Sequence, residues 1–168
     1  MNRAVFLDRD GVINHNDVRD GRPHGPETLA RFVILPGVRE AVEAFRAAGF
    51  LAIVATNQPS VAREAVEAMH AMLRKNLPLD DIKVCFHVDA DNCACRKPKP
   101  GLLLEAAREH DISLAQSWMI GDRWRDVEAG KAAGCRTVFI DHGYAGERRP
   151  QAPDVIVGSL LEAVPFVI

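Results

Sequence analysis

Apolar positions along the chain follow two periods, one typical of buried strands and one typical of amphipathic helices. Short β-branched runs predict strands, and apolar residues three and four positions apart predict helices. In segment 37–49, for example, Val38, Ala41, Val42 and Phe45 share one helical face, and the segment stops at a glycine. The pattern predicts strands at 4–8, 50–57, 82–88, 117–122, 136–141 and 154–157, and helices at 37–49, 61–76, 101–112, 125–134 and 159–167.

The order of these elements predicts the fold class. Strands alternate with helices, and the strands are almost fully apolar, which is typical of a parallel sheet with helices on both faces. We therefore expect one α/β domain over residues 1–168, a usual size for a single domain. Because proline disrupts helix interiors, the sequence does not define where the last helix ends relative to Pro165. Two long loops, 14–35 and 89–101, do not fit the alternation, and such loops are usually functional or disordered.

Composition and charge argue against several classes of protein. Hydrophobic residues make up 48% of the chain, enough for a full core. The formal net charge is −2 without a basic tail, which gives no sign of binding to nucleic acid or an anionic membrane. No apolar run approaches the length of a membrane span, and Asp8 interrupts the first one too early for a signal peptide. We therefore expect a cytoplasmic protein, and the lack of an exposed apolar helix stripe favours a monomer.

Polar side chains gather at the carboxyl ends of the predicted strands, where open parallel sheets bind ligands. Six residues share this edge or its loops: Asp8, Asp10, Thr56, Asn57, Lys97 and Asp122. Clustered carboxylates without nitrogen or sulfur ligands fit a hard cation such as Mg²⁺; the alternative is that they are protonated. A lone strand-end aspartate can instead cap a helix or form a turn. Capping, however, does not require acids from separate strands to converge.

A second set of residues has the spacing of a metal site. Cys85, His87, Cys93 and Cys95 form the pattern C-x-H-x5-C-x-C, with the three thiols and one imidazole that structural Zn²⁺ prefers. In a cytosolic chain such cysteines favour metal binding over disulfides. Residues two apart in a strand share a face, so Cys85 and His87 should point the same way. The alternative is that all four are ordinary strand and loop residues. Cys135 is left over, and we expect it to be a small buried residue.

Four sequence motifs together resemble the haloacid dehalogenase (HAD) superfamily of phosphatases. The stretches FLDRDGVI, TNQ, RKPKPG and GDRWRD occur in the family's order and span residues 5 to 126. The resemblance implies a Rossmann-like parallel sheet with the first strand in its centre. It also implies a phosphomonoesterase that works through an aspartyl-phosphate.

The resemblance assigns a catalytic role to each matching residue. Asp8 matches the nucleophile, and Asp10 matches the acid/base that protonates the leaving alkoxide and then activates water. Thr56 and Asn57 match the motif that holds the phosphoryl oxygens. Lys97 matches the lysine that neutralises the nucleophile and the phosphoryl group.

The resemblance also implies a magnesium site. Asp122 matches a Mg²⁺ ligand, together with Asp8 and the backbone carbonyl of Asp10, and Asp126 would be a supporting or additional ligand. A carboxylate that attacks a phosphate dianion meets charge repulsion, which Mg²⁺ and a lysine would offset. Gly11 would permit the turn that the second aspartate needs.

The cysteine loop narrows the resemblance to a zinc-containing branch without a large cap domain. That branch includes heptose bisphosphate and histidinol-phosphate phosphatases. The VAR and KPKPGLL stretches are similar to the heptose enzymes. The short spacer between His87 and Cys93 is more usual in the histidinol enzymes, and Pro59, Ser60 and Glu64 depart from the heptose pattern. We expect removal of the 7-phosphate from D-glycero-D-manno-heptose 1,7-bisphosphate, with histidinol phosphate as the alternative substrate.

Three arginines are candidates to hold a second anionic group of the substrate. Arg63 ends the VAR stretch, Arg96 follows the candidate zinc ligand Cys95, and Arg123 follows Asp122. The planar guanidinium suits phosphate, although each arginine could be an ordinary surface residue.

Two other classes of protein share part of this pattern. A receiver or phosphate-binding module accepts a phosphoryl group at aspartates near sheet ends without turnover. Such a module would lack an acid/base two residues after the nucleophile, where this chain has Asp10. A polynucleotide 3′-phosphatase is disfavoured by the acidic charge balance.

Overall fold

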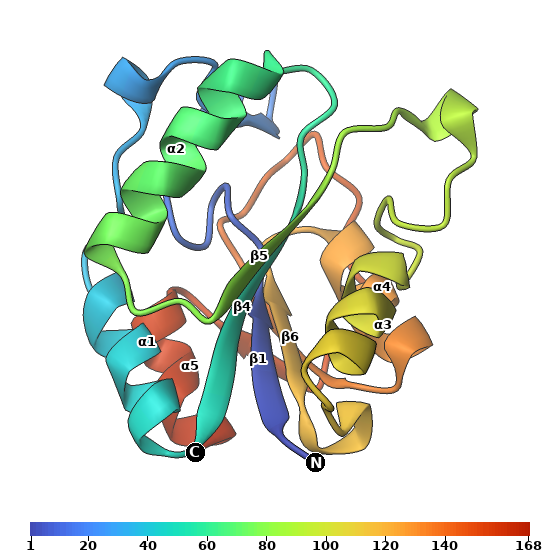
Figure 1. Cartoon of the computed structure of the whole chain (residues 1–168). Coiled ribbons are helices and arrows are strands. Elements are labelled where there is room, and N and C mark those ends of the chain that lie inside the picture. Colours follow the sequence, from blue (N-terminus) through green and yellow to red (C-terminus); the bar gives the residue numbers. More distant parts are fainter.

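A parallel sheet lies between two layers of helices in the computed structural model, which describes all of residues 1–168 (Figure 1). Its six strands have the order β5-β4-β1-β6-β7-β8, and every neighbouring pair is parallel. The strands are β1 (Arg3–Leu7), β4 (Phe50–Asn57), β5 (Asp81–Cys85), β6 (Trp118–Gly121), β7 (Arg136–Ile140) and β8 (Val155–Val157). The predicted α/β sheet, with the first strand in its interior, is confirmed.

Five helices cover both faces of the sheet, close to their predicted bounds. One face carries α1 (Val38–Ala47), α2 (Arg63–Asn76) and α5 (Leu160–Val167), and the other carries α3 (Gly101–Glu109) and α4 (Trp124–Ala133). Pro165 lies within α5, which continues past it. None of these helices combines the length and the apolar composition that crossing a membrane requires.

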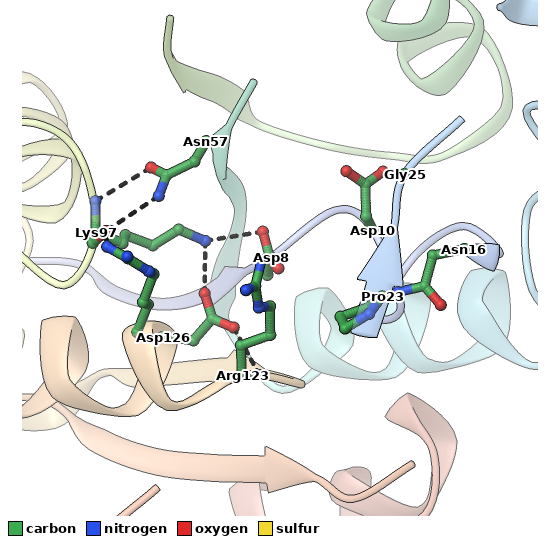
Figure 2. Close-up of a pocket in the computed structure, with 10 residues that line it drawn as sticks. Asp8, Asp10, Asn16, Pro23, Gly25, Asn57, Lys97, Arg123 and Asp126 are labelled. Carbon is green, nitrogen blue, oxygen red and sulfur yellow. Dashed lines mark hydrogen bonds and ion pairs between the residues drawn. The ribbon is translucent and has the colours of Figure 1, made fainter. Parts of the chain in front are cut away.

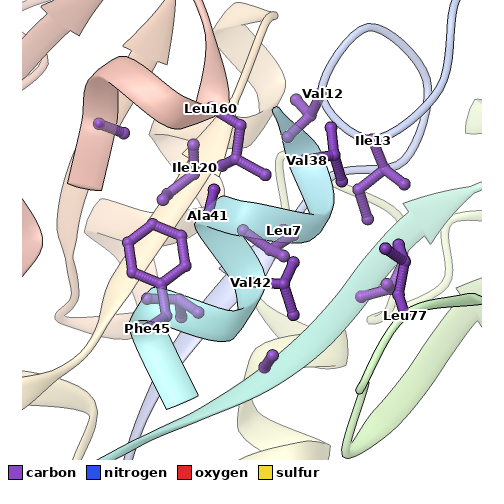
Figure 3. Close-up of a cluster of buried hydrophobic side chains, with 14 of the residues drawn as sticks. Leu7, Val12, Ile13, Val38, Ala41, Val42, Phe45, Leu77, Ile120 and Leu160 are labelled. Carbon is purple, nitrogen blue, oxygen red and sulfur yellow. The ribbon is translucent and has the colours of Figure 1, made fainter. Parts of the chain in front are cut away.

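Side chains of the inner strands alternate between two cores, because successive residues of a strand point to opposite faces. In β1, Val5 and Leu7 join the cluster beneath α1, α2 and α5, and Ala4 and Phe6 join the cluster beneath α3. Figure 3 shows the first of these clusters, in which Phe45 of α1 is fully buried. Burial of both faces explains why the strands are continuous apolar runs in the sequence.

The two long loops are only partly irregular, and neither is large enough to form a cap domain. The first folds into a hairpin of β2 (Asp17–Arg19) and β3 (Arg22–His24), followed by a single 3-10 turn at Leu29–Arg31. The second contains one 3-10 turn at Asp89–Asp91, and a further such turn at Leu114–Gln116 precedes β6.

The third predicted strand is shorter than expected. β5 ends at Cys85, where its pairing with β4 also ends, so His87 lies beyond the strand. β5 is an edge strand, and residues past the last pairing have no neighbour to hold them in the sheet. Cys85 and His87 therefore do not share a strand face, and that prediction is wrong.

Candidate active site

Three buried carboxylates meet at the carboxyl edge of the sheet. Asp8 follows β1, Asp122 follows β6, and Asp126 lies in the first turn of α4, with oxygens within 4.8 Å of one another. We call these residues the acidic trio. Burial, and then the charge of Asp126, raises the pKa of Asp8 to about 6. Burial and the charges of Asp8 and Asp126 raise the pKa of Asp122 well above its ordinary value. The fold therefore concentrates negative charge that a cation would relieve.

Lys97 reaches the acidic trio from the second long loop and is itself only 2% exposed. Its Nζ donates to Asp8 Oδ1 at 2.8 Å and to Asp126 Oδ1 at 2.6 Å (Figure 2). The same Nζ also donates to the carbonyl of Ala55 at 2.7 Å. Burial alone would lower the pKa of Lys97, but the charges of Asp126 and Asp8 outweigh it and raise the pKa. The Asn57 side chain fixes the Lys97 backbone through two hydrogen bonds of 3.1 Å each. Lys97 thus stays charged and directed at Asp8.

The acidic trio fits a hard divalent cation. Oδ1 of Asp122 is buried without a hydrogen-bond partner, whereas Oδ2 accepts from Tyr144 Oη at 2.6 Å. Both oxygens of Asp126 are occupied, by Lys97 Nζ and by the backbone N–H that precedes α4 at 3.0 Å. Asp8 and Asp122 are therefore the carboxylates that could hold Mg²⁺, and Asp126 supports the arrangement.

Asp10 lies beside the trio, but its carboxylate is directed elsewhere (Figure 2). Oδ1 accepts from Asn14 at 2.9 Å and from Arg9 Nε at 3.0 Å, and Oδ2 accepts from Gln58 at 2.8 Å. Gly11 has a φ of +82°, and a Cβ at this position would overlap the carboxylate that follows β6. Glycine is therefore required at this turn, as the sequence indicated.

Two members of the acidic trio, Asp8 and Asp126, line a small pocket that has no hydrophobic lining residue. Its walls include Asn16, Pro23 and Gly25 from the first long loop (Figure 2). A second hollow adjoins this pocket, and we call it the arginine hollow because four arginines line it: Arg22, Arg96, Arg123 and Arg125. Two adjoining polar hollows suit a ligand with two anionic groups.

Three predicted residues of the active site line neither hollow: Thr56, Arg63 and Asp122. Thr56 is buried, and its hydroxyl accepts from Gln58 at 2.9 Å. Arg63 is the first residue of α2, and its guanidinium lies over the ring of Phe86, 4.3 Å from the ring centroid. By contrast, Arg96 lines the arginine hollow, where its Nε donates to Asp89 at 2.7 Å.

The candidate zinc ligands do come together, beyond the end of β5. Ligand atoms of Cys85, His87, Cys93 and Cys95 all lie within 4.8 Å of one another. The Sγ atoms of Cys85 and Cys95 are 3.0 Å apart, and His87 Nδ1 is 3.4 Å from Cys95 Sγ. Three thiols and one imidazole at these separations are compatible with Zn²⁺. Cys135 is buried elsewhere, as expected.

Several residues of the site have no motif that identifies them in the sequence. Tyr144 contacts Asp122, and Asn16 donates to Tyr144 Oη at 3.0 Å. Glu147 accepts from Arg123 at 2.8 Å. The only signal for any of them is the unexplained length of the 14–35 loop, which contains Asn16.

Comparison with known proteins decides the family. Residues 94–163 match the family model described as HAD-hydrolase-like. The D-glycero-β-D-manno-heptose-1,7-bisphosphate 7-phosphatase of Rhodopseudomonas palustris is 39% identical in an alignment of 148 residues, and the match covers 78% of this chain and 79% of that protein. The chain belongs to the HAD family of phosphatases. The protein of the same name from Pseudomonas putida is 37% identical to this HAD phosphatase, over 87% of this chain and 86% of its own.

A solved structure agrees with the family. The crystal structure of D,D-heptose 1,7-bisphosphate phosphatase from B. bronchiseptica, complexed with magnesium and phosphate, matches this HAD phosphatase with a TM-score of 0.77. The two chains are 26% identical, and the match covers 98% of this chain and 97% of that chain. The two proteins share one fold along almost their whole length, without a separate cap domain in this chain.

We predict that the purified HAD phosphatase contains one equivalent of zinc and that Cys95→Ser loses it. Replacing one thiolate leaves three ligands, too few for a closed structural site. Elemental analysis and thermal melting measure the result, and the variant should melt at a lower temperature because metal binding is coupled to folding. Cys135→Ala is the matched control, since it removes a thiol outside the cluster, and should keep its zinc. A wild-type protein without zinc, or a Cys95→Ser variant that retains it, would contradict the prediction.

Proposed function

We propose that this HAD phosphatase removes the 7-phosphate of D-glycero-β-D-manno-heptose 1,7-bisphosphate. The observation that carries the proposal is the acidic, lysine-bearing pocket beside a hollow lined by four arginines. A bisphosphate can place its reacting phosphate at Asp8 and its other phosphate among the arginines. Relatives that align with most of the chain carry this enzyme's name.

Asp8 has the position of a nucleophile at the end of an inner strand, where its backbone N–H donates to the carbonyl of Ile120 at 3.0 Å. Its carboxylate oxygen attacks phosphorus while the bond from phosphorus to the sugar oxygen breaks, leaving an aspartyl-phosphate. Lys97, 2.8 Å from Asp8, reduces the repulsion between the carboxylate and the phosphate dianion.

Asp10 has the position of the acid/base. It gives a proton to the departing sugar alkoxide, then takes a proton from the water that hydrolyses the aspartyl-phosphate. Hydrogen bonds from Asn14, Arg9 and Gln58 keep its carboxylate separate from the acidic trio through both steps. Asp8 can therefore act as the nucleophile while Asp10 transfers the protons.

Two metals complete the proposal. Asp8, Asp122 and the backbone carbonyl of Asp10 would hold Mg²⁺, which when bound neutralises charge on the phosphoryl oxygens. The buried, unpartnered Oδ1 of Asp122 supports this site. A structural Zn²⁺ in the cysteine cluster would order the loop that carries Arg96 and Lys97. Both residues directly follow Cys95 in the chain.

The alternative substrate, histidinol phosphate, is not favoured. Its single phosphate would leave the arginine hollow without an anion. The relatives named above are heptose bisphosphate phosphatases, despite the short spacer between His87 and Cys93 that is more usual in the histidinol enzymes.

We expect kcat/KM to be at least about tenfold higher for the heptose bisphosphate than for histidinol phosphate or a heptose 7-monophosphate, because one charge-assisted phosphate contact is worth about 1.5–3 kcal/mol. Phosphate release from each substrate with Mg²⁺ present measures it. Fructose bisphosphate and a 3′-phosphorylated oligonucleotide complete the panel. A preference for histidinol phosphate, or for the oligonucleotide, would overturn the proposal.

Arg96→Gln should raise the KM for the bisphosphate about tenfold or more, with little change in the KM for p-nitrophenyl phosphate, which has a single phosphate. Arg63→Gln is the matched control, because Arg63 lies over Phe86 and outside both hollows. It should behave like the wild-type protein with both substrates. Equal effects of Arg96→Gln on the two substrates would show that the arginine hollow does not receive a second phosphate.

A further inference from the structure

Segment 141–147 follows β7 and contacts Asp122 of the acidic trio through Tyr144, although it carries no metal-binding motif. His142 Nε2 lies 2.7 Å from the carbonyl oxygen of Gly11, in the turn after β1. Glu147 accepts from Arg123 at 2.8 Å, at the start of α4. The backbone of the segment also bonds to the β2–β3 hairpin. The segment is therefore tied down on both sides of Tyr144, between these contacts.

Tyr144 bonds to the carboxylate on the magnesium side of the site. Its hydroxyl donates to Oδ2 of Asp122 at 2.6 Å, and Asn16 Nδ2 lies 3.4 Å from the same oxygen. Asn16 Nδ2 also donates to Tyr144 Oη at 3.0 Å. Oδ1 of Asp122 is buried and has no partner. Oδ2 of Asp122 is thus hydrogen-bonded to the protein, whereas Oδ1 has no hydrogen-bond donor.

The remaining neighbours of Asp122 would not keep it in this orientation. The other carboxylates within 4.8 Å are Asp8 and Asp126, and like charges at this separation repel. A donor on the far oxygen opposes that repulsion by fixing the rotation of the carboxylate. Partners of this kind orient metal ligands in proteins generally.

We propose that Tyr144 is a positioning residue for Mg²⁺: its hydroxyl holds Asp122 Oδ2, so that Oδ1 faces the cation between Asp122 and Asp8. Asn16 supports the hydroxyl from the first long loop. The inference rests on the magnesium dependence proposed above and extends it to a residue outside the four motifs. Tyr144 does not touch the reacting atoms, so it acts on the affinity for the cation rather than on the chemical step.

Because the chain has a single tyrosine, that residue can be observed directly. Protein labelled with 3-fluorotyrosine should give one ¹⁹F resonance, and adding Mg²⁺ alone should shift it. The same label in an Asp122→Asn protein should show no shift. A resonance that does not respond to Mg²⁺ in the unsubstituted protein would contradict the contact between Tyr144 and the cation site.

The variant Tyr144→Phe removes only the hydroxyl and should weaken cation binding about tenfold, since a hydrogen bond to a charged group is worth about 1.5–3 kcal/mol. Mn²⁺ serves as the probe, and its Kd is measured from the EPR signal of the free ion. The Mg²⁺ concentration that gives half-maximal activity should rise in parallel, and saturating Mg²⁺ should recover most of the turnover. Arg149→Gln is the control. It breaks an exposed 2.7 Å ion pair with Asp141, the first residue of the same segment, and should bind Mn²⁺ as tightly as the wild-type protein.

The outcomes separate this inference from the proposed function. If the wild-type protein binds neither Mn²⁺ nor Mg²⁺, the magnesium-dependent mechanism fails and this inference with it. If the wild type binds and Tyr144→Phe binds equally well, only the inference fails. Lost turnover at every Mg²⁺ concentration with unchanged Mn²⁺ affinity would also overturn it, because the hydroxyl would then act on the reaction itself.

Discussion

The site depends on one buried ion pair network, in which the ammonium of Lys97 lies between Asp8 and Asp126. All three of its N–H donors are used, since the third bonds to the carbonyl of Ala55. A buried charge is tolerated only when it is paired and hydrogen-bonded, so this lysine can be buried only with its partners in place. One positive charge nevertheless faces three carboxylates, and Asp122 keeps a bare oxygen. The network therefore holds Asp8, the proposed nucleophile, and at the same time leaves negative charge that a cation would neutralise.

The parallel sheet makes this network possible. Leu7, the last residue of β1, is in register with Val54 of β4 on one side and with Ile120 of β6 on the other. The carboxyl ends of three adjacent inner strands thus lie side by side, and the residues that follow them share one edge. Because both faces of these strands are buried in the two cores, Asp8 and Asp122 start from rigid backbone. The fold thus holds the proposed nucleophile and the proposed metal ligand in place.

Sequence patterns predicted the elements, because periodicity is a local and regular property, and the shared carboxyl edge of parallel strands predicted the convergence of the acids. The central position of the first strand followed only from the family resemblance. These patterns did not predict the direction of side chains at the ends of helices and strands. Arg63 opens α2 and contacts Phe86 instead of the site, and His87 lies beyond the edge strand while still reaching the cysteine cluster. Contacts across the chain were also missed, since Asn16 and Tyr144 are 128 residues apart and belong to irregular segments. A cytoplasmic, monomeric state without nucleic acid or membrane partners stays a prediction of the sequence.

The central claim is that this network makes Asp8 the phosphoryl acceptor. It is tested most directly by mixing the heptose bisphosphate with an Asp10→Asn protein in Mg²⁺, quenching in acid, and mapping the modified peptide by mass spectrometry. Asp10→Asn keeps the nucleophile but removes both the acid that protonates the sugar alkoxide and the base that activates water, so an aspartyl-phosphate should form slowly and then persist. The account predicts a phosphoryl adduct on Asp8 that is absent when Asp8 is also replaced by asparagine. Turnover without any adduct, or an adduct on another residue, would contradict it.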